Sequence, residues 1–253
     1  MMLGMRPIGF FAISIMIFVC ANAFGLWIRR RWADEVGRES GSLKTLESAV
    51  LALLGLLLGF TFSMAVSRYD TRKALEIEEA NDIGTLWLRT SLLSETGHVA
   101  EQALITRYVH ARLEFSASGR SQERFVKSAE DTARLQQQMW DVAMQEANLR
   151  RDPESALFVS VLNDSIDVTE KRKAALENRI PAPAWEMLLG MGAIGCSLVA
   201  LSFQGKMTGL QIMLPLILAS TLTLIYDIDS PRSGLIRVQQ QSMERLAQSV
   251  GVQ

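Results

Sequence analysis

The sequence predicts an all-α membrane protein in which four transmembrane helices, arranged as two pairs, flank a helical-bundle insert. Four apolar stretches each reach the length of roughly 20 residues that a bilayer-spanning helix needs. Charged residues gather between the second and third stretches, where the apolar positions recur at helical spacing. The 253-residue chain is 49% hydrophobic and 21% charged, which is ordinary for a soluble protein. The uneven distribution therefore excludes a uniform soluble domain, which the overall composition alone would allow.

The four apolar stretches cover residues 8–28, 46–67, 184–203 and 207–226. A backbone in hydrocarbon must satisfy its own hydrogen bonds, and no stretch alternates like a barrel strand, so we expect helices. Spans three and four are separated only by Gln204–Lys206, which predicts an antiparallel hairpin. The expected organisation is transmembrane helices 1 and 2 in residues 1–67, an extramembrane helical bundle in 68–183, a transmembrane hairpin in 184–226 and a C-terminal tail in 227–253.

The first span has two interpretations. Arg6, the apolar run and Ala21-Asn22-Ala23 together resemble a cleavable signal peptide with a small-residue site. However, apolar character continues through Trp27 and Ile28, and Arg29-Arg30-Arg31 follows. An uncleaved, anchored span fits that pattern better.

The insert is expected to be helical throughout, with a helix that continues directly out of span two. Breaks are expected at Ser94–Gly97 and at Ser118–Gly119. Asp152-Pro153-Glu154 combines a capping residue, a first-turn proline and a first-turn acid, which predicts the start of the last insert helix. Pro181 and Pro183 end that helix just before span three.

The charges suggest where the insert lies. Lys and Arg near span ends favour the cytoplasm, and more of them flank the insert side than the opposite side. Arg29-Arg30-Arg31 argues against this orientation, but the total favours a cytoplasmic insert and a multi-pass protein of the bacterial inner membrane. The net charge of −1 gives no support for nucleic-acid binding.

The sequence offers little enzyme chemistry. No nucleophile motif, phosphate loop or zinc signature is found, so we expect no enzyme, no cofactor and no metal site. Cys20 and Cys196 lie in apolar runs and predict no disulfide framework.

Two acidic pairs are candidate ion-binding residues. Glu78 and Asp82 lie four residues apart on one helix face, but an ion site there would need carboxylates from another helix or subunit. Asp227 and Asp229 follow span four, next to a predicted cap and turn. For the first pair the favoured interpretation is a solvated face whose acids pair with cations of the same helix, namely Arg72, Lys73 and Arg89.

Span two carries the strongest pattern within the membrane, a stripe of small residues that would let helices approach closely. The favoured interpretation is packing within the subunit, and the alternative is packing around an oligomer axis with Phe60, Phe62 or Ser63 near a lumen. Because the cores of all four spans contain no ionisable residue, a proton-coupled transporter is disfavoured. The absence of charge is compatible both with a pore gated by an apolar constriction and with a plain membrane anchor. The stripe consists of Ser48, Ala52, Gly55, Gly59 and Ser63.

Several segments resemble the bacterial bestrophin-like family of membrane proteins. They are Ser67-Arg68-Tyr69-Asp70 with Glu76–Asn81 after span two, Pro183-Ala184-Trp185 before span three, and Asp229–Leu235 after span four. The chain departs where such proteins often have an Asp-Arg-Pro-Phe-type turn, because it has Asp-Ser-Pro-Arg. The resemblance implies kinship with bestrophins, pentameric ion channels with two spans, a long cytoplasmic helical insert and two more spans.

The leading hypothesis is therefore a homo-oligomeric membrane protein, a pentamer by analogy, whose second span lines a pore for inorganic ions in the lipid bilayer. The alternative is a non-conducting membrane scaffold or sensor whose helical insert recruits a partner.

Overall fold

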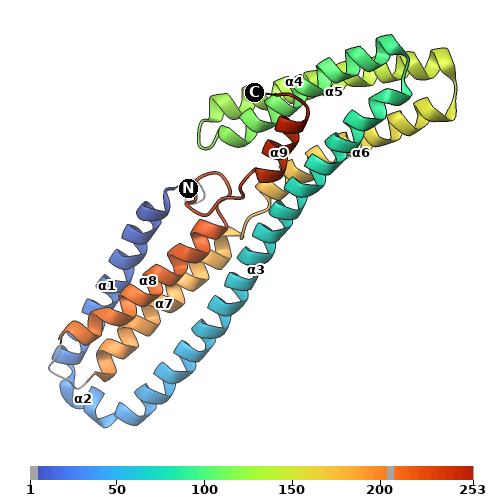
Figure 1. The fold of residues 1–253 in the computed structure, drawn as a ribbon. Helices are drawn as coiled ribbons and strands as arrows, with labels where there is room; N and C mark the ends of the chain where they lie inside the picture. Colours follow the sequence, from blue (N-terminus) through green and yellow to red (C-terminus); the bar gives the residue numbers. More distant parts are fainter. Residues whose placement is uncertain (1–4, 204–207, 253) are drawn as a thin grey trace. The chain divides into compact units, whose positions relative to one another are not determined.

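The computed structural model describes residues 5–203 and 208–252, and every regular element among them is a helix (Figure 1). The predicted connection through Gln204–Lys206 lies outside the described residues. The helices are α1 (Pro7–Arg31), α2 (Ala33–Arg38), α3 (Ser40–Arg89), the short 3₁₀ helix η2 (Thr90–Leu92), α4 (Glu95–Ala117), α5 (Gln122–Arg150), α6 (Pro153–Glu177), α7 (Ala182–Ser202), α8 (Thr208–Ile228) and α9 (Gln241–Ser249).

The chain divides into two compact units, and α3 contributes residues to both. The membrane unit consists of residues 1–69 and 179–237, and the insert unit consists of residues 70–178 and 238–253. The predicted C-terminal tail is thus divided between them, and α9 belongs to the insert unit.

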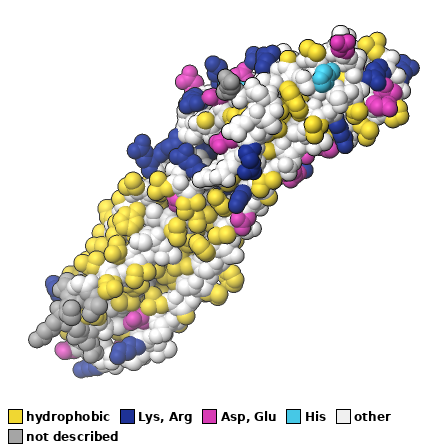
Figure 2. All heavy atoms as spheres, in the orientation of Figure 1, with side chains coloured by type: hydrophobic (Ala, Val, Ile, Leu, Met, Phe, Trp, Pro, Cys, Tyr) yellow, Lys and Arg dark blue, Asp and Glu magenta, His cyan; other side chains and the backbone are white. Residues whose placement is uncertain are grey.

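Four helical stretches of the described chain are long and apolar enough to cross a membrane, which confirms the predicted all-α membrane fold. Figure 2 shows hydrophobic side chains gathered on the visible face of the membrane unit, and charged side chains spread over that of the insert unit. Hydrophobic side chains left exposed on a membrane helix face lipid or another helix, so this surface fits a bilayer.

The membrane unit packs α1 against α7 and α8. Phe10 stacks on Tyr226 at 4.3 Å between ring centroids, and both rings meet Trp185 edge-on. A β-carbon on Gly192 would lie 2.7 Å from the Phe18 ring, so a larger residue there would have to displace this buried ring. Cleavage after Ala23 would remove Phe10 and Phe18 from this core, which favours the uncleaved first span.

The insert unit has its own apolar core, built from the second half of α3 with α4, α5, α6 and α9. Its fully buried side chains include Leu86, Tyr108 and Phe158. The predicted break at Ser118–Gly119 lies between α4 and α5, whereas the first break comes slightly earlier than predicted, because Glu95–Gly97 already belong to α4. Ser94 and Asp152 cap α4 and α6, and each accepts a hydrogen bond from a backbone N–H three residues on.

Candidate pore face and buried carboxylates

The small stripe of span two lies on an outward face of α3. Ser48, Ala52, Gly55, Gly59 and Ser63 are all exposed in the protomer. A β-carbon on Gly55 or Gly59 would find no atom within 4 Å apart from its own helix. The favoured interpretation from the sequence, packing within the subunit, is therefore wrong for these residues.

The opposite face of α3 provides the packing within the subunit. Leu54, Thr61 and Ala65 are buried and lie at helical spacing, so a second stripe faces α3's neighbours in the membrane unit. Phe60 and Phe62, in contrast, are 60% and 42% exposed. The packed face of α3 was not predicted correctly from the sequence, because both faces of this span are apolar or small.

The close contacts within the membrane unit instead involve glycines of α1 and α7. A β-carbon on Gly25 would collide with the backbone carbonyl of Ser197, and one on Gly195 would lie 3.1 Å from Leu51. Two helices that approach this closely gain van der Waals contact in lipid, where water supplies no hydrophobic driving force between them.

The strongly polar residues of the spans hold helices together. The Asn22 side-chain amide donates to the backbone carbonyls of Cys196 at 3.5 Å and of Gln211 at 3.3 Å. The Asn22 side chain thereby links α1 with α7 and α8, and the side chains of Asn22 and Gln211 are both 6% exposed. Neither side chain offers a hydrated surface within the protomer.

Asp227 and Asp229 organise the turn that follows α8. The carboxylate of Asp227 accepts hydrogen bonds from the backbone N–H groups of Leu235 at 2.7 Å and Ile236 at 2.9 Å. Asp229 accepts one from Ile180 at 3.1 Å, and its Oδ1 lies 3.8 Å from the Arg68 guanidinium. Both aspartates are buried, and their oxygens are committed to the protein's own backbone.

Glu78 and Asp82 lie together on α3, as their spacing predicts, and face α6. The Glu78 carboxylate lies 3.4 Å from the Lys171 ammonium, a partner that the sequence analysis did not name. Partial burial, and then the nearby carboxylates of Glu78 and Asp164, raise the pKa of Asp82. In the described part of the chain no three His, Cys, Asp or Glu side chains are grouped closely enough to hold a metal ion.

An ionic network that was not predicted from the sequence lies at the centre of the insert unit. Glu79 is fully buried and receives hydrogen bonds from Arg112, at 2.7 Å, from Arg172 and from the Thr169 hydroxyl, at 3.1 Å. The same Thr169 hydroxyl lies 2.7 Å from the Tyr108 hydroxyl. Burial alone would raise the pKa of Glu79, but the two guanidinium groups outweigh burial and lower it.

The signal for this network was the position of Glu79 on the helix. Glu79 shares a face of α3 with Ile83 and Leu86, which are both fully buried, so helical spacing places the carboxylate in the core. One turn earlier, buried Glu76 accepts hydrogen bonds from the backbone N–H groups of Ser242 and Met243, each at 3.0 Å. Glu76 thereby caps the start of α9.

A second buried carboxylate, Glu101 on α4, has no such partners. Neither oxygen of Glu101 has a hydrogen-bond partner among the described residues, and the side chain is fully inaccessible to solvent. Burial raises the pKa of Glu101 to about 8. At neutral pH Glu101 is therefore mainly protonated.

The fold and the outward small-residue face of α3 define an α-helical membrane protein with two spans on either side of a helical insert. The Bestrophin-like domain model matches residues 15–243. The chain belongs to the Bestrophin-like family.

Solved structures show the same fold. Two are crystal structures of single-substitution variants of a bacterial bestrophin homologue from Klebsiella pneumoniae. One is 16% identical, covers 98% of this chain and 99% of its own, and has a TM-score of 0.67. The other is 14% identical, covers 96% and 97%, and has a TM-score of 0.71. No curated protein matches the chain.

Proposed function

We propose that the protein is a homo-oligomeric ion channel of the bacterial inner membrane whose pore is lined by the membrane-spanning part of α3. One observation carries the proposal: the small residues of this span point away from the protomer while the opposite face of the same helix is packed. A second copy of the chain would find there a surface that allows close approach between helices.

Two exposed apolar side chains flank this face. Phe60 and Phe62 are two residues apart and so point about 160° apart around the helix, one on each side of the small stripe. A ring of such side chains around an axis forms a constriction that closes by excluding water, and Ser63 within the stripe adds a small hydroxyl. The family relationship supports an assembly of identical subunits, and a pentamer is the stoichiometry that analogy with bestrophins suggests.

The insert is proposed to lie in the cytoplasm, on the side that carries most Lys and Arg near the span ends. Glu78 and Asp82 are the ion-binding candidates left on an accessible surface, where a bound cation would compete with the Lys171 ammonium for the Glu78 carboxylate. Asp227 and Asp229 would have to release backbone hydrogen bonds to bind an ion, so their proposed contribution is weaker.

The second candidate is a scaffold or sensor whose insert recruits a partner. It is favoured by a groove of about 680 Å³ between α3 and α9 within the insert unit. Ile77 and Leu88, which line this groove, are 42% and 72% exposed, although such side chains are usually buried.

The experiment compares glycines that face outward on different helices. Gly55→Leu and Gly59→Leu should leave the protomer folded, reduce the oligomer seen by native mass spectrometry, and abolish ion flux in reconstituted liposomes. Gly190→Leu is the matched control, because Gly190 is also outward-facing with open space around it but lies on α7. A wild-type protein that stays monomeric and carries no flux for any tested ion would overturn the proposal.

A further inference from the structure

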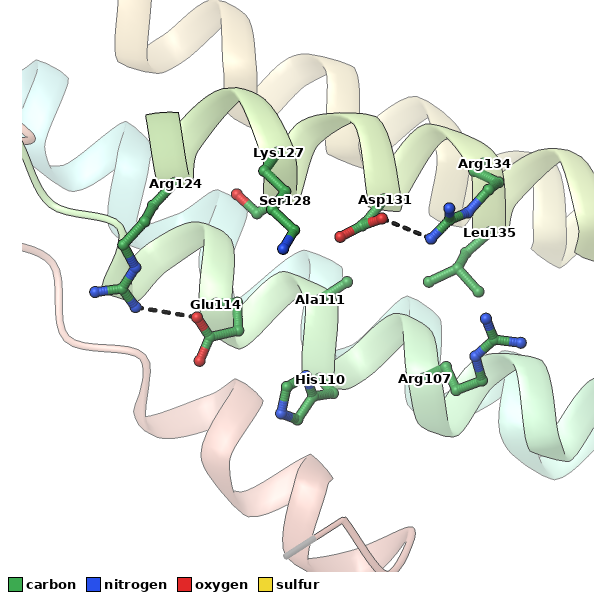
Figure 3. A pocket seen from close by; sticks show the side chains of 10 residues that line it. All are labelled: Arg107, His110, Ala111, Glu114, Arg124, Lys127, Ser128, Asp131, Arg134 and Leu135. Atoms are coloured by element: carbon green, nitrogen blue, oxygen red, sulfur yellow. Dashed lines mark hydrogen bonds and ion pairs between the residues drawn. The ribbon is translucent and has the colours of Figure 1, made fainter. Parts of the chain in front are cut away.

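A groove between α4 and α5 of the insert unit carries an excess of positive charge. The groove has a volume of about 490 Å³, within the size range of about 300–1,000 Å³ that is usual for small-molecule sites. Its charged side chains come from both helices, and the apolar side chains of Ala111 and Leu135 also line it (Figure 3).

Two of the cations lining this groove are already neutralised. Arg124 pairs with Glu114 at 3.0 Å, and Arg134 pairs with Asp131 at 2.6 Å. These two carboxylates are the acidic groups of the groove, so no acidic side chain of the lining remains for its other cations.

Those other cations are Arg107 on α4 and Lys127 on α5. Neither has an ion pair or a side-chain hydrogen bond within residues 5–203 and 208–252. Figure 3 shows both side chains directed into the space between the two helices. The groove therefore has two positive charges that the described protein does not balance.

We propose that this groove binds a small soluble molecule that carries two or more phosphate groups. The planar guanidinium of Arg107 can donate two parallel hydrogen bonds to one phosphate, and the Lys127 ammonium can hold another as a compact charge. Ala111 and Leu135 provide an apolar surface for the rest of the molecule. All the residues of the site lie in α4 and α5, outside the membrane-spanning part of α3 that is proposed to line the pore.

The test is isothermal titration of the full-length, detergent-solubilised protein with sodium tripolyphosphate at low ionic strength. Wild-type protein should bind, and the double substitution Arg107→Gln with Lys127→Gln should raise the Kd by at least about tenfold. The control pair, Lys73→Gln with Lys173→Gln, removes the same charge from exposed positions outside the groove and should change the Kd by less than about twofold.

A second variant, which is expected to bind more tightly, keeps the test informative if the Arg107→Gln and Lys127→Gln double substitution unfolds the insert. Glu114→Gln with Asp131→Asn frees Arg124 and Arg134 and should tighten tripolyphosphate binding at least about threefold. No binding by wild-type protein, equal weakening by the groove and control pairs, or no tightening by the acidic pair would each overturn the proposal.

Discussion

Glu79 and Glu101 are both completely buried in the insert unit, yet at neutral pH Glu79 is ionised and Glu101 is mainly neutral. Glu79 receives hydrogen bonds from Arg112, Arg172 and Thr169, and its pKa is lowered. Glu101 has no hydrogen-bond partner in the described chain, and its pKa is raised to about 8. Burial alone does not decide the charge of a carboxylate, because the groups that surround the buried side chain decide whether its pKa is raised or lowered.

The two sites also stabilise the fold in different ways. The ion pairs at Glu79 fix how α3, α4 and α6 meet, because removing one partner would leave a charge buried without compensation. Glu101 is tolerated in the core because it holds a proton there. The insert unit therefore contains one carboxylate that must stay ionised and one that must stay neutral.

The largest expected effect comes from breaking the paired site. Arg112→Met should lower the free energy of unfolding by about 3–5 kcal/mol, because Glu79 keeps its buried charge and loses one of its two guanidinium partners. Urea unfolding in detergent micelles measures the change. Arg245→Met removes an exposed cation and serves as the control, and an equal loss in both variants would contradict the assignment.

The unpaired site should make stability depend on pH. Glu101 has a raised pKa in the folded state, so from about pH 4.5 to about pH 8 the folded chain holds a proton that the unfolded chain has released. With respect to Glu101, the free energy of unfolding is highest below pH 4.5. It should fall as pH rises towards 8, by up to about 1.4 kcal/mol per pH unit.

Glu101→Gln should remove this slope and stabilise the insert at pH 8. Glu95→Gln, an exposed position on the same helix, should leave the slope unchanged. Glu79 works in the opposite direction: its lowered pKa gives stability that is present above its ordinary value of 4.5 and is lost as pH falls below it. A pH profile that is flat between pH 5 and 8 in wild-type protein would refute the role of Glu101.

A smaller effect is expected at Glu76, whose partners in the described part of the chain are backbone N–H groups. Glu76→Ala removes the acceptor for the Ser242 and Met243 amides, and loss of a helix cap costs about 0.5–2 kcal/mol. Hydrogen exchange should become faster at these two amides and along α9, while the core of α4 stays protected. Uniformly faster exchange over the whole insert would indicate a global effect instead.

The smallest effect is expected on the solvent face of the same helix. Glu78 pairs with Lys171, but both side chains are about half exposed, so water and salt screen the pair. Glu78→Gln should change the free energy of unfolding by less than about 0.5 kcal/mol. A loss comparable to that of Arg112→Met would mean that Glu78 also acts as a core carboxylate.

The amino-acid sequence was sufficient to predict the four spans, the helical insert and most helix ends. Length and apolar character decide the spans, and residues such as Asp152 and Pro153 determine a helix start through local hydrogen bonding. The helix α2, between spans one and two, was not predicted, since its six residues carry little periodicity.

The sequence was not sufficient to decide what each candidate residue contacts. Gly55 and Gly25 are both glycines within apolar spans, but of the two only Gly25 closely approaches another helix within the protomer. Likewise, Glu78 and Glu79 are adjacent, and one is exposed while the other lies in the core. These differences depend on which faces the tertiary fold covers, and a single helical period does not contain that information.

The contribution of α9 to the insert affects how the protein is made. Met243, Ala247 and Val250 complete a core whose other members were all synthesised before residue 163. A ribosome releases the chain from its N-terminus onward, so this core is completed only after α9 has emerged. All four spans are therefore available for membrane insertion before the insert unit has acquired α9. A nascent chain stalled before Gln241 should have an incompletely folded insert that proteases cleave readily.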